Sequence, residues 1–256
     1  MAEPELKPLY EKNIYMALLA QQCSRYKEMF NYFEDLIKQR EKEGKSKDLS
    51  PQERELLSFG YISLINSQRH SLHICMAFET KERKEYNSPI LPLILEYRKK
   101  IETELTDSIE KIVNTLDNIL IKNAEENLTK IYYLKLKGDF NRFITEYEKG
   151  LSRERASSGG LKAYQEAMNL AKNMNIMNRL LLGLNWNYAI FQMEVVGERK
   201  NAMSVAEECL NKVDKELPSF NMDKNNEDYG IIMELIERMR RSLKKWRIEE
   251  DEQNKI

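Results

Sequence analysis

The chain has 256 residues, of which 32% are charged, and its 41 Lys and Arg residues are almost balanced by 42 Asp and Glu residues. A protein that binds polyanions generally needs a basic excess, so the formal net charge of −1 argues against non-specific nucleic-acid binding. The 9 Gly and 6 Pro residues are few for an all-β protein with many tight turns, and 41% hydrophobic residues suffice for a packed core.

Targeting and redox signals are weak. Residues 1–10 are polar, and no stretch approaches 18 uninterrupted apolar residues, so neither a secretory signal nor a membrane span is expected. The three cysteines, Cys23, Cys75 and Cys209, are odd in number and widely spaced, which fits neither a disulfide framework nor a zinc site. We therefore expect a reduced, cytoplasmic protein.

Apolar residues recur at spacings of three and four from end to end, which predicts helices. The first apolar stretch, residues 10–40, divides near Cys23, and Ser24 is expected to cap a second helix. The polar stretch 41–48 predicts a loop. Ser50 then has the side chain of an N-cap, with Pro51 at the first helical position and Glu53 in place to close a capping box.

Similar signals divide the rest of the chain. A break at 88–92 precedes a long helix over 92–122, and Asn123 with Glu126 predicts a second capping box before a helix that ends near 147. Residues 157–160 (SSGG) predict a loop. Further helices are expected over 161–174, 178–196, 199–216 and 226–249. The pattern predicts an all-α protein of about nine helices, with one domain over 1–249 and a short polar tail over 250–256.

No catalytic group stands out. The two histidines, His70 and His73, lie three residues apart without further metal ligands nearby. Gly-rich phosphate loops, a G-x-S-x-G nucleophile motif and Cys–His motifs are absent from the sequence. We therefore expect no catalytic residue, no metal and no cofactor, and an enzyme is disfavoured.

Several polar residues instead recur at helical spacing. Lys135 and Arg142 are seven residues apart and so share a helix face, and Arg69 lies within a mostly apolar helix. Asn187 and Glu194 are also seven residues apart, with Ile190 between them. These residues are either ordinary exposed side chains, which spacing alone favours, or a groove in which guanidinium groups face apolar side chains and bind a phosphorylated peptide.

Five segments resemble, in order, helix signatures of the 14-3-3 family. They are residues 54–61 (RELLSFGY), 96–105 (EYRKKIETEL), 133–143 (YLKLKGDFNRF), 163–167 (AYQEA) and 182–188 (LGLNWNY). The resemblance covers about 10–246. It implies nine antiparallel helices, dimerisation through the N-terminal helices, and a concave amphipathic groove that binds phosphoserine or phosphothreonine segments of partner proteins.

The resemblance also implies residue roles. Arg69 and Arg142 match the arginines that grip the phosphate, and Asn187 matches the asparagine that holds the peptide backbone. Other groove positions fall on Lys135, Phe143, Trp186, Ile190, Glu194 and Leu235, with Trp186 in place of a leucine. Dimer-interface positions fall on Arg25, Glu28, Tyr97, Lys100 and Glu104, with Arg25–Glu104 and Glu28–Lys100 as ion pairs between subunits.

Two departures from the family bear on phosphate binding. Ile62 stands where the family has a phosphate-contacting lysine, and Phe143 replaces a tyrosine and so lacks its hydroxyl. A hydrogen bond to a charged group contributes about 1.5–3 kcal/mol and one from a neutral hydroxyl about 1 kcal/mol. The two losses predict phosphate binding weakened by about 2–4 kcal/mol, or about 30- to 1000-fold.

The last helix matches the family in two registers. In one, Met239 and Leu243 stand at the positions of a second backbone-binding asparagine and a tryptophan, and in the other these positions fall on Ser242 and Trp246. The first register is favoured, because Ile232 and Met233 align with the family directly and an insertion within a helix rotates its face.

Two functional hypotheses follow. The leading one is a homo- or heterodimeric, non-catalytic adaptor that binds phosphorylated protein segments, without nucleic-acid binding or a membrane span. The alternative is a helical scaffold for unphosphorylated partners, as in tetratricopeptide arrays, and the changes at Ile62 and Phe143 keep it open. A further hypothesis concerns regulation. Ser157 and Ser242 each follow arginines, and either serine could be phosphorylated on a flexible segment, although unmodified surface serines are the favoured interpretation.

Overall fold

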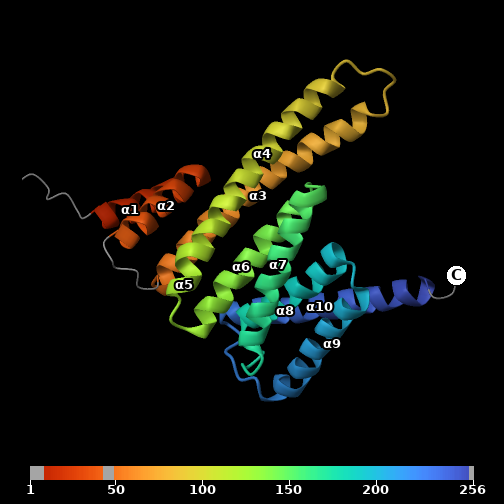
Figure 1. Cartoon of the computed structure of the whole chain (residues 1–256). Helices are drawn as coiled ribbons and strands as arrows, with labels where there is room; N and C mark the ends of the chain where they lie inside the picture. Colours follow the sequence, from red (N-terminus) through yellow and green to blue (C-terminus); the bar gives the residue numbers. More distant parts are fainter. Residues whose placement is uncertain (1–8, 43–48, 254–256) are drawn as a thin grey trace, which may run out of the picture. The chain divides into compact units, whose positions relative to one another are not determined.

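The computed structural model describes residues 9–42 and 49–253, and Figure 1 labels its helices. The α-helices are α1 (Leu9–Gln22), α2 (Tyr26–Lys42), α3 (Pro51–Glu82), α4 (Leu91–Thr115), α5 (Ile121–Asn123), α6 (Asn127–Ile144), α7 (Gly150–Ala171), α8 (Arg179–Phe191), α9 (Arg199–Glu216) and α10 (Glu227–Gln253). Two π-helical turns, η1 (Leu116–Leu120) and η2 (Gln192–Val196), extend α4 and α8, and a 3₁₀ turn, η3 (Leu217–Ser219), follows α9.

The prediction of an all-α fold is confirmed. Because α4, η1 and α5 follow one another without a break, the described residues form nine helices, and they contain no strand. Contacts divide the chain into an N-terminal unit, Met1–Glu125, and a C-terminal unit, Glu126–Ile256, which are described separately below.

In the N-terminal unit, α1 packs against α2 and the long helices α3 and α4 run antiparallel to each other (Figure 1). Its core holds fully buried side chains from α2, α3 and α4, among them Met29, Phe33, Leu57, Ile65, Leu105 and Ile109. The hydroxyl of Tyr61, which is buried with them, donates a hydrogen bond of 2.6 Å to Glu34.

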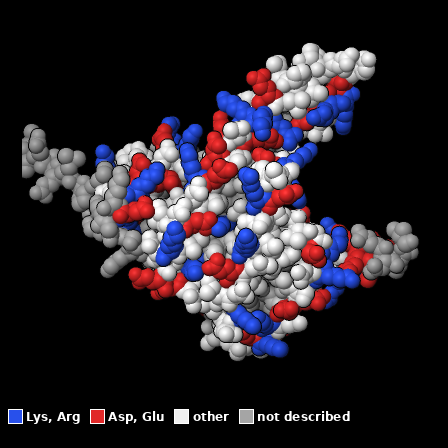
Figure 2. Space-filling view, in the orientation of Figure 1, with Lys and Arg blue, Asp and Glu red and all other residues white. Residues whose placement is uncertain are grey.

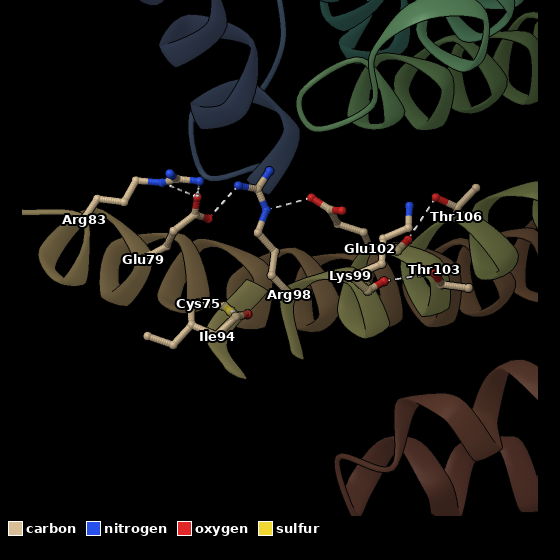
Figure 3. Close-up of polar contacts among 9 residues, drawn as sticks. All are labelled: Cys75, Glu79, Arg83, Ile94, Arg98, Lys99, Glu102, Thr103 and Thr106. Carbon is tan, nitrogen blue, oxygen red and sulfur yellow. Dashed lines mark hydrogen bonds and ion pairs between the residues drawn. The ribbon is translucent and has the colours of Figure 1, made fainter. Parts of the chain in front are cut away.

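A charged cluster joins α3 to α4 (Figure 3). The buried Glu79 accepts hydrogen bonds at both carboxylate oxygens, at 2.8 Å from Arg83 on its own helix and at 2.7 Å from Arg98 on α4. Arg98 also donates to Glu102 at 2.8 Å. The two guanidinium groups hold the pKa of Glu79 below its usual range, so the carboxylate is charged at neutral pH.

In the C-terminal unit, α6 packs along α7, and α8 packs against α9 and α10. The core contains Tyr133, Phe140, Tyr164, Phe191, Ile236 and Met239, each almost fully buried. Gly138 allows α6 and α7 to approach, because a Cβ atom at this position would lie 2.7 Å from the Tyr164 ring. The glycine therefore serves close packing of the two helices.

Local start signals succeeded at one helix and failed at two. Ser50 and Glu53 form the predicted capping box at the start of α3, where Ser50 N donates to Glu53 Oε2 at 2.7 Å. The predicted box at Asn123 is wrong: Asn123 ends α5, and Glu126 is the N-cap of α6 without a side-chain hydrogen bond. The loop expected at 41–48 falls mostly outside the described residues.

Ser24 does not cap α2, contrary to the prediction. It has a left-handed backbone (φ 55°) and belongs to the end of α1, where Ser24 N donates to Gln21 O and Arg25 N donates to Ala20 O. These two bonds form a Schellman motif, which satisfies the last carbonyl groups of a helix. The prediction failed because Ser24 ends α1 instead of beginning α2.

The loop predicted at 157–160 is also wrong, because these residues lie within α7. A Cβ atom at Gly160 would lie 2.9 Å from the Phe191 ring, and one at Gly159 would lie 3.1 Å from Asn141 Oδ1. The two glycines therefore serve helix packing. Ser157 in α7 and Ser242 in α10 are both half-buried residues of helices, so the flexible segment required by the regulatory hypothesis is absent at both serines.

Candidate peptide-binding surface

The predicted groove residues are divided between the two units. Arg69 lies on α3 of the N-terminal unit. The other residues belong to the C-terminal unit: Lys135, Arg142 and Phe143 on α6, Trp186, Asn187 and Ile190 on α8, Glu194 in η2, and Leu235 on α10. The C-terminal unit can therefore be described as one surface, and Arg69 is described in its own surroundings.

Two predicted residues of the C-terminal unit meet at one carboxylate. Asp139 accepts a bond of 2.7 Å from Lys135 Nζ at Oδ2 and one of 2.7 Å from Asn187 Nδ2 at Oδ1. Its Oδ1 also accepts a bond of 2.5 Å from the hydroxyl of the fully buried Tyr164. Burial and the neighbouring carboxylate raise the pKa of Tyr164 well above its usual value, so the phenol stays protonated and donates.

Arg142 lies one turn beyond Asp139 and contacts two other acids. Its Nη1 is 3.5 Å from Glu194 Oε2 and 3.7 Å from Glu146 Oε1, and its guanidinium carbon lies 5.1 Å from the centre of the Phe143 ring. Both ion pairs are long compared with a charge-assisted hydrogen bond of about 2.7–2.9 Å. The two acids therefore make only long-range ion pairs with the Arg142 guanidinium group.

Apolar side chains of α8 and α10 lie in the same unit. The rings of Trp186 and Trp246 stack with their centres 6.0 Å apart and an angle of 13° between their planes. Ile190 and Leu235 are half-buried. Met239, Leu243 and Trp246 are 0%, 6% and 8% exposed, so burial does not distinguish the two registers of the last helix, and the ring that contacts Trp186 is that of Trp246.

Arg69 lies on the face of α3 that also carries Ile62, seven residues before it. Arg69 is half-buried, whereas Ile62 is 40% exposed and so presents apolar surface where the resemblance implies a lysine. His70 and His73, on the same helix, are exposed.

The predicted dimer residues all belong to the N-terminal unit, and all except Tyr97 are charged. Arg25 and Glu28 form an exposed ion pair with each other within the chain. On α4, Tyr97 is 60% exposed, and Lys100 and Glu104 are also exposed. Because these three residues share a helix face, they present one continuous strip of α4 to solvent.

The sequence analysis identified the cations and Glu194, but it missed the other polar residues of this surface. Asp139, Glu146 and Tyr164 were not singled out, although Asp139 and Glu146 each follow their cation by four residues, the spacing of helical ion pairs. Figure 2 shows acidic and basic side chains intermingled on the face in view. At the predicted site the two cations, Lys135 and Arg142, pair with three acids, Asp139, Glu146 and Glu194, so the charges there are also nearly balanced.

Other kinds of site receive no support from the described residues. Among them, His, Cys, Asp and Glu side chains do not gather in a group suited to a metal ion, and no helix has the length and apolar character needed to span a bilayer. Cys23 is exposed, and Cys75 and Cys209 are buried, with burial raising the pKa of Cys209 to about 12.

Comparisons with known proteins place most of the chain in one family. The family model described as 14-3-3 protein matches residues 16–247. The chain is 33% identical over 237 residues to the 14-3-3-like protein GF14 chi of Arabidopsis thaliana, a match that covers 92% of this chain and 87% of the relative. It is 34% identical over 227 residues to the 14-3-3-like protein B of Nicotiana tabacum, covering 88% of each chain.

Proposed function

Because this chain belongs to the 14-3-3 family, whose members are non-catalytic phosphopeptide-binding adaptors, we propose that it binds phosphoserine or phosphothreonine segments of partner proteins with a weakened phosphate grip. The observation that carries the proposal is the pair of neighbouring sites on α6 and α8. Arg142 provides a guanidinium group that is paired only at long range with two acids, and Asn187, which donates to Asp139 on the same helix as Arg142, provides an amide for a peptide backbone.

Within the C-terminal unit, the phosphate would bind Arg142. The resemblance assigns a phosphate-binding role also to Arg69 of the N-terminal unit, and it places Lys135 in the peptide groove. Exchange of the carboxylates around Arg142 for a phosphate dianion is favourable, because two phosphate oxygens can accept parallel guanidinium bonds. The bound segment would continue past Asn187 toward the apolar side chains Trp186, Ile190 and Leu235.

The weakening arises at Ile62 and Phe143. An exposed isoleucine contributes neither charge nor a hydrogen bond to a phosphate, and the Phe143 ring, 5.1 Å from the guanidinium carbon of Arg142, keeps a cation–π contact without a hydroxyl donor. We expect affinities about 30- to 1000-fold below those of a site that has both groups.

Dimerisation through the exposed α4 strip is part of the proposal. Arg25 and Glu28 would give up their mutual pairing for Glu104 and Lys100 of the partner subunit. Sedimentation equilibrium of the full chain tests this step: Arg25→Glu combined with Glu28→Lys should shift the equilibrium toward monomer, and an unchanged molecular mass would contradict the assignment.

The test of the main proposal is a fluorescence-anisotropy titration. A labelled peptide from a phosphopeptide-library screen is measured with and without its phosphate. The phosphorylated form should bind at least about ten-fold more tightly, the equivalent of one charge-assisted contact. Arg142→Glu should abolish binding of the phosphorylated form, whereas Arg155→Glu, an equal charge change at an exposed position of α7, should preserve it.

Equal affinity for both forms would instead support a scaffold for unphosphorylated partners. The stacked pair Trp186 and Trp246 would then carry the interaction, and Trp186→Ala would weaken binding more than Arg142→Glu does.

A further inference from the structure

Asp139 lies at the meeting point of three helices, and neither the family match nor the sequence motifs give it a role. Its oxygens are 2.5 Å from the Tyr164 hydroxyl on α7, 2.7 Å from Asn187 Nδ2 on α8 and 2.7 Å from Lys135 Nζ on α6. We propose that Asp139 is a positioning residue for peptide recognition, because its carboxylate fixes the orientation of the Asn187 amide. The inference rests on the proposed function.

The argument begins with the chemistry of an amide. The Asn side chain has an acceptor at Oδ1 and two donor hydrogens at Nδ2, and rotation by a half turn about χ2 exchanges their places. An ionised carboxylate only accepts hydrogen bonds, so it stabilises the orientation in which Nδ2 faces Asp139. Oδ1 of Asn187 then points away from Asp139 and can accept a hydrogen bond from a backbone N–H of the bound segment.

Tyr164 and Lys135 hold the carboxylate in place. Tyr164 is fully buried, and its hydroxyl binds the same oxygen, Oδ1, that accepts from Asn187. Lys135 binds the other oxygen, Oδ2, and the side chains of Lys135 and Asp139 are only 19% and 14% exposed. With both oxygens engaged, the carboxylate cannot turn without losing a short hydrogen bond.

The charges around Asp139 point to positioning rather than to attraction of the phosphate. A carboxylate repels a phosphate dianion, and it neutralises the nearest cation, Lys135. Its presence is therefore unfavourable for charge attraction alone. Orientation of Asn187 accounts for an acid at this position, since a neutral amide in its place could either donate or accept and would stabilise both orientations of the Asn187 side chain.

A double-mutant cycle in the full chain tests the inference. Asp139→Asn should lower the affinity for a phosphopeptide by about five-fold, which corresponds to the loss of one neutral hydrogen bond. In a background that already carries Asn187→Ala, the same substitution should have no weakening effect, because the group that it orients is gone. Additive losses in the two backgrounds would overturn the inference, since a merely structural role predicts them.

Two controls separate the causes. Lys130→Gln removes a different ion pair of α6, with Glu166, and should leave the affinity unchanged. If wild type binds the phosphorylated and unphosphorylated peptides equally, the proposed function fails and the inference fails with it. If wild type prefers the phosphorylated peptide but the cycle is additive, only the inference fails.

A second measurement covers the case in which Asp139→Asn does not fold. In wild type, nuclear magnetic resonance of the Asn187 side-chain amide, assigned by the loss of its signals in Asn187→Asp, should show one hydrogen with the downfield shift and weak temperature dependence of a hydrogen bond. Two hydrogens with the properties of a solvated amide would overturn the inference.

Discussion

The Glu79 cluster predicts a large loss of stability from one substitution, Arg98→Met. The methionine keeps an apolar stem of similar length but removes the guanidinium group, which donates at 2.7 Å to Glu79 and at 2.8 Å to Glu102. The side chains of Glu79 and Arg98 are only 7% and 23% exposed, so water replaces the lost partner poorly. Figure 3 shows that Arg83 approaches the other oxygen of Glu79 and remains after the substitution.

The magnitude follows from the burial of Glu79. Removing one partner of a buried ion pair costs about 3–5 kcal/mol when the remaining charge has no other partner. A hydrogen bond to a charged group is worth about 1.5–3 kcal/mol. Since Arg83 still compensates Glu79, we expect Arg98→Met to lower the free energy of unfolding by about 3 kcal/mol. Arg83→Met is the matched control and should cost about 1 kcal/mol, because the Arg83 side chain is 56% exposed.

Urea unfolding at neutral pH measures the free energy of unfolding of both variants. A loss of stability below about 1 kcal/mol for Arg98→Met would refute the reasoning. The pH dependence gives a second check. The folded-state pKa of Glu79 is lowered, so this group contributes stability above its unfolded pKa and loses the contribution as the pH falls through the folded value. The difference in the free energy of unfolding between wild type and Arg98→Met should therefore become smaller in acid, below about pH 4.5.

Three further predictions concern affinity and stability. Ile62→Lys should strengthen phosphopeptide binding about ten-fold or more in the anisotropy titration, and an equal gain for the unphosphorylated peptide would contradict a phosphate contact. Ser24→Gly should raise the free energy of unfolding by about 1 kcal/mol, because the left-handed backbone of this residue is unstrained only in glycine. Gly138→Ala should lower the free energy of unfolding by about 2–3 kcal/mol through the clash with Tyr164. Gly230→Ala, where an added Cβ atom meets no atom within 4 Å, should instead stabilise α10 by up to about 1 kcal/mol. Similar urea midpoints for the two variants would contradict the packing argument.

Features encoded within one helix were predictable from the sequence. The capping box at Ser50 and Glu53 depends only on residues three apart, and the helix over Arg199–Glu216 was predicted with its observed bounds. The loop prediction for Ser157–Gly160 was wrong because the conformation of these residues depends on contacts with other helices. The composition of this stretch favours a loop, but the close approach of Phe191 and Asn141 requires small residues within a helix, and a single sequence does not show which residues will approach.

In the candidate site, too, features within one helix were predictable from the sequence, whereas contacts between helices were not. Lys135 and Arg142 share a helix face because they are seven residues apart, which spacing alone shows. The pairing of Arg142 with Glu194 joins α6 to η2, and the bond from Tyr164 to Asp139 joins α7 to α6, so both depend on how helices pack. The π-turn at Gln192–Val196 further alters the spacing on which Glu194 was placed beside Asn187.

The paired charges have a consequence for selectivity. Lys135 is neutralised by Asp139, and Arg142 lies between Glu146 and Glu194, so the surface offers little net attraction to an anion at a distance. A ligand must instead displace the carboxylates at short range. A phosphate dianion can do so through two parallel bonds to one guanidinium group and a higher charge than a carboxylate. Under the proposed function, local neutrality would therefore favour a single, well-placed phosphate over acidic peptides and polyanions, which agrees with the net charge of −1 for the whole chain.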